Sequence, residues 1–285
     1  MAEPIRVTVL RGETVESVHH VHAVAVREGE TVASAGDPEL VTFMRSAAKP
    51  IQALPLARAR EDLDERDLAI ASASHLANDE QLAAVRALLA KAPATEDDLE
   101  CGPFEGSKLK HNCSGKHAGM LALCHANGWP TTGYRLPDHP CQQAMLDEFT
   151  TLAGTDQIRT AVDGCGVVTF ALPLRLMAKA FAGIDGRVAA AMRAYPELIR
   201  GPQAPDTILM QTFPGWIAKG GAEALMCAAS SDGLAFALKV EDGAPRALRP
   251  ALGSFLAMLG LEGSRFGPSP ISNSRDEVVG EVRAC

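Results

Sequence analysis

The chain has 285 residues, of which 47% are hydrophobic and 22% are charged, values that are ordinary for a globular protein. Its formal net charge is −8 and it contains no run of lysine or arginine, which excludes the clustered positive charge that nucleic-acid binding needs. No stretch approaches the roughly 18 apolar residues that span a bilayer, and no signal peptide is recognisable, so we expect a cytoplasmic protein without a membrane partner.

The first 45 residues are typical of β-structure. Residues 5–10 alternate between apolar and polar types with the period of a strand. Residues 21–27 and 31–35 flank a Glu-Gly-Glu turn, and this arrangement predicts a β-hairpin.

The middle of the chain is predominantly helical, because apolar residues recur there at helical spacing between loops that contain glycine and proline. The predicted helices cover residues 50–60, 79–91, 116–127, 139–153, 171–182 and 186–195. We expect Pro140 at the first position of its helix, and Asn78 or Asp79 as the N-cap of the helix at 79–91.

Strands return near the C-terminal end. Residues 224–230 and 234–240 flank a Ser-Asp-Gly turn and predict a second hairpin, and residues 246–260 have helical spacing. We expect the tail after Gly263 to be poorly structured.

Strands at both ends with helices between them imply that the termini share one antiparallel sheet, against which the helical middle packs as a lobe. The predicted fold class is therefore α+β. We predict one domain over residues 1–285, with the sheet from about 5–45 and 220–245 and the helical lobe from about 46–215.

Two residue types are used unusually. The seven cysteines are an odd number in a chain without an export sequence, which indicates reduced thiols rather than a disulfide framework. Only eight lysines stand against 19 arginines, so a lysine here suggests a task that arginine cannot perform, such as losing its proton or ligating a metal. Several lie beside small or polar residues instead of on charged helix faces: Lys49, Lys108, Lys110, Lys116 and Lys219.

The segment Arg45-Ser46-Ala47-Ala48-Lys49-Pro50 places Ser46 and Lys49 one helical turn apart on one face. A serine nucleophile needs a neighbouring base, and a lysine serves when burial lowers its pKa. Because proline does not suit a helix interior, we expect the helix to begin near Lys49, with Ser46 in the turn that precedes it. On spacing alone, a capping serine and a surface lysine explain the segment better than a catalytic pair does.

Three further segments contain residue types that are used in catalysis or metal binding. Ser74-His75 follows a run of small residues, which we interpret as the end of a strand leading into a site loop. The passage from His111 to His117 gathers histidine, asparagine, cysteine and lysine, and Asp163-Gly164-Cys165-Gly166 has the glycines of a loop that approaches a ligand or metal. Each also has a structural explanation as a cap or as a buried cysteine in a turn. Lys239, in an apolar strand, must either lie at an edge or serve a site.

These segments, in this order over residues 5 to about 262, resemble the signatures of the rhizobial-type L-asparaginases, the asparaginase II family. Two later segments continue the resemblance, Lys219-Gly220-Gly221-Ala222-Glu223 and Lys239-Val240-Glu241-Asp242-Gly243. The resemblance implies a fold similar to serine β-lactamases and penicillin-binding proteins. It also implies a homodimer that hydrolyses L-asparagine to L-aspartate and ammonia.

The resemblance also implies roles for single residues. Two Ser–Lys tandems carry over onto Ser46 with Lys49 and onto Ser74 with Lys239, with Ser46 as the nucleophile. Substrate-binding candidates are Arg45, Asp163, His75 and Asn112. One zinc ion per chain is implied at Cys113, Lys116 and Cys165, and because the lysine must be neutral to bind it, zinc affinity should depend on pH.

Two alternatives remain open at the level of sequence. One is a serine amidase or β-lactamase-like hydrolase of another substrate, against which the lack of an export sequence speaks. The other is a zinc-containing binding protein that has lost catalysis, against which the intact set of Ser46, Lys49, Ser74 and Lys239 speaks.

Overall fold

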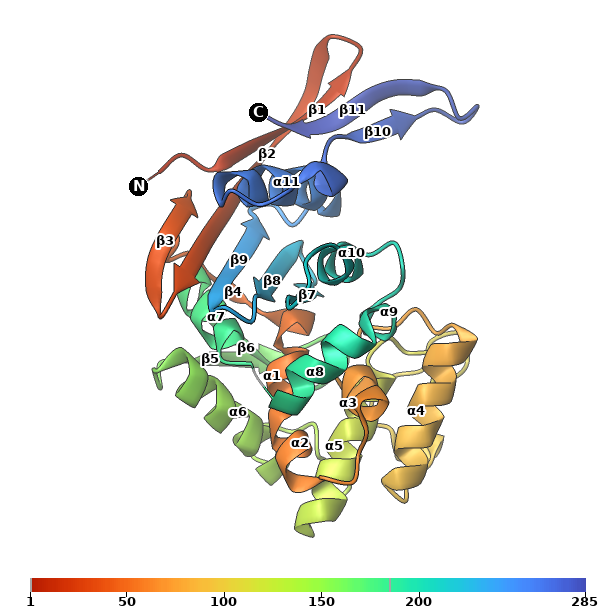
Figure 1. Ribbon diagram of the computed structural model, residues 1–285. Helices are drawn as coiled ribbons and strands as arrows, with labels where there is room; N and C mark the ends of the chain where they lie inside the picture. Colours follow the sequence, from red (N-terminus) through yellow and green to blue (C-terminus); the bar gives the residue numbers. More distant parts are fainter. Residues whose placement is uncertain (1, 185) are drawn as a thin grey trace.

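Strands from both ends of the chain meet in one antiparallel sheet, and a lobe of helices from the middle packs below it (Figure 1). The computed structural model describes residues 2–184 and 186–285. The predicted α+β class and the shared sheet are confirmed, because β2 pairs with strands from both halves of the chain.

The main sheet has eight strands in the described part of the chain, in the order β10-β11-β1-β2-β9-β8-β7 with β3 also beside β2. Their bounds are β1 (Ile5–Arg11), β2 (Thr14–Arg27), β3 (Glu30–Ala35), β7 (Ile217–Gly221), β8 (Leu225–Ala229), β9 (Leu234–Val240), β10 (Ser269–Ser272) and β11 (Val278–Ala284). Both predicted hairpins are confirmed, as β2–β3 and β8–β9.

The expectation of a poorly structured tail after Gly263 is wrong. β11 pairs with β1 over five residues, from Val7 opposite Ala284 to Arg11 opposite Gly280, and β10 pairs with β11. β10 has only four residues, and the burial of β11 does not alternate, since Val282 is its one buried residue, so neither strand has a recognisable sequence pattern. The tail therefore closes one side of the sheet.

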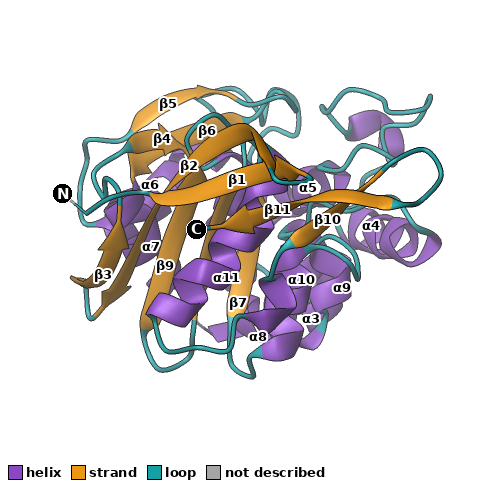
Figure 2. Cartoon of the chain, turned by 90° about the horizontal axis from the view of Figure 1, so that it is seen from above, coloured by secondary structure: helices purple, strands orange, loops and turns teal. Residues whose placement is uncertain are grey.

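The register of the sheet decides which side chains share a face. Lys219, Cys227 and Ala237 lie in one row across β7, β8 and β9, and Gly221, Leu225 and Lys239 lie in the next row on that face. Phe236 of β9 points to the other face, where its ring lies 5.9 Å from that of Phe255 in the helix that crosses the sheet in Figure 2. The lysine-bearing face is therefore the one toward the helical lobe.

The described helices agree with the prediction where capping residues mark their ends. Asn78 caps the helix that starts at Asp79, and Pro140 occupies the first turn of its helix. The helices are α1 (Lys49–Gln52), α2 (Leu54–Ala59), α3 (Glu65–Ala71), α4 (Asp79–Lys91), α5 (Ser114–Asn127), α6 (Pro140–Ala153), α7 (Leu174–Ala182), α8 (Gly186–Ala194), α9 (Pro196–Ile199), α10 (Pro205–Thr212) and α11 (Leu248–Met258). Within residues 2–184 and 186–285, none of them combines the length and the apolar character that crossing a membrane requires.

Short elements correct the prediction in two places. The interpretation of the residues before Ser74 as a strand is wrong, since α3 ends there. The helix expected from residue 171 begins at Leu174, because the preceding residues belong to a small sheet. That sheet has the order β4-β6-β5, with β4 (Val41–Phe43), β5 (Arg159–Val162) and β6 (Val168–Pro173).

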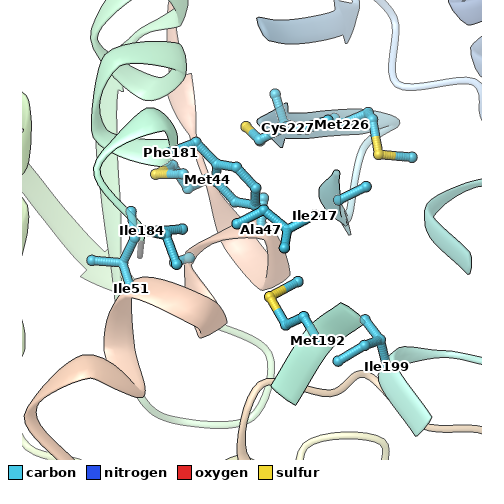
Figure 3. Close-up of a cluster of buried hydrophobic side chains, with 14 of the residues drawn as sticks. Met44, Ala47, Ile51, Phe181, Ile184, Met192, Ile199, Ile217, Met226 and Cys227 are labelled. Carbon is cyan, nitrogen blue, oxygen red and sulfur yellow. The ribbon is translucent and has the colours of Figure 1, made fainter. Parts of the chain in front are cut away.

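The turn that carries Ser46 rests on a buried apolar cluster (Figure 3). Met44, Ala47 and Ile51 point into it from the turn and from α1, and Phe181 of α7 and Ile217 of β7 meet them from the other side. Each large side chain that is fully buried here contributes about 1.5–3 kcal/mol. The cluster therefore fixes the position of the segment between Met44 and Ile51.

Edge strand β7 lies directly against this turn. A Cβ atom added to Gly221 would come within 2.6 Å of the Met44 carbonyl oxygen and 3.4 Å of the Ala47 nitrogen. Only glycine permits so close an approach. Residues 44–49 of the lobe and the end of β7 are thus brought together although about 170 residues separate them in the sequence.

Candidate functional site

Ser46 lies in a 3-10 turn, Arg45–Ala48, that runs directly into α1 at Lys49. The predicted start of the helix near Lys49 is therefore confirmed. Arg45 has a left-handed φ of 50°, which costs a non-glycine residue about 1 kcal/mol and is typical of functional segments. Its amide nitrogen donates to Thr169 Oγ1 at 3.2 Å, a bond that ties the turn to β6. Ser46 itself is half-buried.

Lys49 is fully buried and its amine points across the site. Nζ donates to the Ala73 carbonyl at 2.5 Å, to Ser74 Oγ at 2.9 Å and to the Asn112 carbonyl at 3.4 Å. Burial lowers the pKa of Lys49, and Lys116 adds to this, while the Cys113 sulfur opposes it. In the described chain, the hydrogen bond of Lys49 goes to Ser74 and not to Ser46.

The loop after α3 is held rigidly around Ser74. The Ser74 amide donates to the Ile199 carbonyl at 2.7 Å. His75 Nδ1 accepts from the Ala77 amide at 3.1 Å, and its Nε2 lies 2.8 Å from Ser114 Oγ. Burial and the nearby Lys49 lower the pKa of His75 to about 4. Both ring nitrogens of His75 are therefore engaged within the protein, so it supports the loop, and nothing in its contacts supports the predicted role in binding substrate.

The predicted zinc ligands lie together. Lys116 Nζ donates to Cys165 Sγ at 3.1 Å, and the thiols of Cys113 and Cys165 share a hydrogen bond. That bond, with Lys49 and Lys116 close by, lowers the pKa of Cys113 and raises that of Cys165. Burial opposes a charge on Lys116, but the two sulfurs outweigh it and raise its pKa. The cluster thus brings two thiols of unequal acidity close to the buried amines of Lys49 and Lys116.

His117 is not part of that cluster. Its Nδ1 lies 2.8 Å from the hydroxyl of Tyr134, and both rings are buried. Burial lowers its pKa well below the usual value, so it is neutral. Proximity in sequence to Cys113 therefore does not make His117 a ligand candidate.

Arg45 and Asp163 form an ion pair next to Ser46. Arg45 Nε donates to Asp163 Oδ1 at 2.6 Å, and the two side chains are 29% and 10% exposed. The Gly164 amide also donates to Asp163, at 2.7 Å. Asn112 is exposed, and its carbonyl accepts from Lys49 as described above. The predicted substrate-binding residues Arg45, Asp163 and Asn112 therefore lie around Ser46 and Lys49.

Lys239 lies apart from these groups. Its ammonium donates to the Val240 carbonyl, and the charges that act on it are Glu223, Asp242 and Glu241. Burial lowers its pKa, and those carboxylates oppose the shift. In the described chain the hydrogen bond to Ser74 comes from Lys49 and not from Lys239, so the pairing that the resemblance implies is not the one seen here.

Another lysine is closer to Lys49. Lys219, on edge strand β7, is fully buried, and burial lowers its pKa to about 7, with Lys49 and Arg200 contributing and Asp206 opposing. It was not among the predicted site residues. Its scarcity as a residue type and its place in an apolar strand pointed to it, but Lys239 has the same features, and only the register tells them apart.

Comparison with known proteins gives one family match. The family described as L-asparaginase II matches residues 7–284 of the chain. No curated protein matches it.

Proposed function

Because the chain belongs to the L-asparaginase II family, we propose that it hydrolyses L-asparagine to L-aspartate and ammonia through a serine nucleophile. The observation that carries the proposal is the position of Lys49, a buried amine that donates to Ser74 Oγ and starts its helix one turn after Ser46. A lysine whose pKa is lowered by burial is the base that a serine nucleophile needs.

In the first half of the proposed reaction, neutral Lys49 accepts the proton of Ser46 while Ser46 Oγ attacks the carboxamide carbon of asparagine. The C–N bond then breaks, and ammonia leaves with a proton that Lys49 returns through Ser74 Oγ, 2.9 Å away. Water hydrolyses the resulting acyl-serine by the same proton path in reverse. Lys49 and the two serines thus lie on the proposed proton path in both halves.

Recognition of an α-amino acid is assigned to Arg45 and Asp163. Their opposite charges lie 2.6 Å apart beside Ser46 and remain partly exposed. A zwitterion suits such a pair, because its carboxylate can bind the guanidinium while its ammonium binds the aspartate. The strained backbone of Arg45 supports a functional role for its side chain.

The second lysine of the site is, in this proposal, Lys219 in place of Lys239. The charge of Lys49 acts on Lys219, whereas the charges that act on Lys239 are those of Glu223, Asp242 and Glu241. Lys239 also lies two strands in from β7, about 10 Å away at the usual strand spacing. Close contact of β7 with the Ser46 turn supports the same choice.

We further propose one zinc ion at Cys113, Lys116 and Cys165. Among the residues that the structure describes, no group of three or more His, Cys, Asp and Glu side chains is placed to hold a metal. This cluster has two sulfurs and an amine instead, and sulfur and nitrogen donors that converge in this way suit zinc. Zinc bound there would supply a positive charge that shapes the substrate pocket.

The metal proposal predicts about one zinc per chain by mass spectrometry of the purified protein. Cys113→Ser and Cys165→Ser should lose it, while Cys124→Ser, a buried thiol on the same helix as Lys116, should keep it. Zinc retained by both of the first two variants would reject the site.

A fold related to serine β-lactamases and a homodimeric state stay predictions of the resemblance, and a cytoplasmic location stays a prediction from the sequence. The antiparallel sheet and the helical lobe that carries Ser46 and Lys49 support the first of these. Light scattering after gel filtration would test the second.

The function is tested by ammonia release from asparagine and glutamine, with a chromogenic β-lactam as the alternative substrate. We expect asparagine turnover in the wild type and a loss of roughly 10⁴-fold in Ser46→Ala. Lys219→Met and Lys239→Met form a matched pair, of which we expect only the first to abolish turnover. Asparagine turnover that survives in Ser46→Ala would overturn the nucleophile, and β-lactam turnover without asparagine turnover would favour the alternative hydrolase.

A further inference from the structure

Asp206 and Lys219 form a buried ion pair next to the candidate site. Asp206 Oδ2 lies 3.7 Å from Lys219 Nζ, and the two side chains are 1% and 0% exposed. Asp206 lies in the first turn of α10, in the segment that connects the lobe to β7. Neither residue type is left fully buried in proteins without a partner.

The pair is closed into a ring by backbone groups. Lys219 Nζ donates to the Gly220 carbonyl at 2.8 Å, and the Gly220 amide donates to Asp206 Oδ2 at 3.1 Å. Because β7 is the last strand of the sheet, an amide on its outer side has no strand partner, and Asp206 takes that place. Asp206 therefore holds both the side chain of Lys219 and the backbone just beyond it.

The charges facing Lys219 come from four segments. Lys49 of α1 and Arg200, which follows α9, are positive, while Cys113 before α5 and Asp206 of α10 favour the charged lysine. Asp206 is the nearest opposing charge and the largest favourable influence. Burial and the two cations act against a proton on Lys219, so Asp206 is what balances them.

We propose that Asp206 is a positioning residue that holds the amine of Lys219 in a fixed place beside the site and supplies the carboxylate against which that amine gains and loses its proton. This proposal rests on the proposed function. Without the carboxylate, burial and the two neighbouring cations would act on Lys219 without their nearest opposing charge, and its amine would lose the partner that fixes its position. With it, Lys219 can take up and return one proton in each turnover, which a proton carrier requires.

One test is the pH dependence of kcat/KM for asparagine in Asp206→Asn, which keeps the shape and an acceptor for the Gly220 amide but removes the charge. We expect one limb of the pH profile to shift to lower pH by at least about one unit. Loss of the Asp206 charge lowers the proton affinity of Lys219, and a tenfold change in that affinity is one pKa unit. The fold-decrease in kcat should exceed the fold-change in KM. The matched control is Asp67→Asn, which removes another buried aspartate that pairs with a lysine, 2.5 Å from Lys91. The control should leave the profile in place.

The second test does not depend on activity. In protein labelled with ¹³C at the lysine ε carbons, eight resonances are expected, and Lys219→Arg identifies the one of interest. We expect Lys219 to titrate near neutral pH in the wild type and at least about one unit lower in Asp206→Asn. The carboxyl carbon of Asp206 should shift with the same midpoint in the wild type, which tests the coupling even where the variant does not fold.

An unchanged Lys219 midpoint in folded Asp206→Asn, or an Asp206 resonance that does not respond at that midpoint, would overturn the role of Asp206. Absence of asparagine turnover in the wild type would instead overturn the proposed function, and the titration would still decide whether Asp206 controls Lys219.

Discussion

His75 lies one residue after Ser74 and is held from both sides. The Ala77 amide donates to Nδ1, which leaves the proton on Nε2, and Nε2 then donates to Ser114 Oγ. Ser114 Oγ in turn donates to the Leu109 carbonyl at 2.8 Å. This chain of hydrogen bonds links the Ser74 loop to the start of α5, where the Cys113–Lys116 cluster begins. It requires a neutral imidazole.

The neutral state of His75 predicts a loss of stability in acid. Its pKa of about 4 in the native state lies below the usual 6.5 that the unfolded chain would show. Between these pH values the unfolded chain binds a proton that the native protein does not, so stability falls as pH decreases from 6.5 to 4. The difference of 2.5 units corresponds to about 3 kcal/mol.

Urea unfolding of the wild type at pH 7, 6 and 5 checks this prediction, with His75→Gln as the comparison. The variant should be less stable at pH 7, by about 1–3 kcal/mol, because a buried hydrogen-bond network is broken. Its stability should also depend less steeply on pH. Equal pH dependence in the two proteins would show that His75 does not cause the acid loss, leaving His117, whose pKa is also lowered, as the group responsible.

Single residues were predictable where their type was itself unusual. The scarcity of lysine pointed to Lys49, Lys116 and Lys219, all of which are buried. It also pointed to Lys108 and Lys110, which lie on a loop and contact the Asp97 carbonyl and Glu105. That Lys49 donates to Ser74 could not be predicted, because this depends on the path of one side chain across the site, and that path leaves no mark in the sequence.

At the scale of elements, capped helices were predictable and short pieces were not. The helix Asp79–Lys91 has the predicted bounds because Asn78 and Gln81 form a reciprocal cap. α3, α10 and the three strands of the small sheet are each eight residues or shorter. Such pieces are stabilised by packing against neighbours, so their local pattern is too brief to indicate them.

The C-terminal hairpin is the element whose removal should matter most. Deletion of residues 268–285 would take away β10 and β11, expose the edge of β1 and remove the buried Val282. We expect a loss of about 2–4 kcal/mol in unfolding free energy and a tendency to aggregate through the open edge.

Thermal unfolding and static light scattering check that prediction. The control is Val278→Lys, which changes a side chain in β11 that is 68% exposed and should leave both measurements unchanged. A truncated protein as stable and as monodisperse as the full chain would show that β1 does not need its outer neighbour.

At the scale of the whole molecule, the helical lobe is inserted between two sets of strands that must find each other. β2 and β9 pair residue 21 with residue 240, whereas most helix contacts of the lobe join residues that are closer in sequence. Contacts between distant residues form slowly because the intervening chain must first be ordered. The shared sheet could be predicted from the order of strands and helices alone, but its strand order could not.

The two tryptophans allow this difference to be measured. Trp129 follows α5 in the lobe, and Trp216 precedes β7 and packs near Phe213, at the end of α10, and Phe236 of β9. In refolding experiments with Trp216→Phe and Trp129→Phe, we expect the Trp129 fluorescence to recover in a faster phase than that of Trp216. One common rate constant for both would mean that lobe and sheet form together.

The close contact between Gly221 and the Ser46 turn has a consequence for synthesis. Ser46, Lys49, Ser74 and the cysteine cluster all leave the ribosome before residue 170, but Lys219 can take its place only when β8 and β9 have followed and β7 has a sheet to join. A nascent or prematurely terminated chain would thus carry its nucleophile without the second lysine. The proposed activity would therefore be gained only as the last third of the chain is completed.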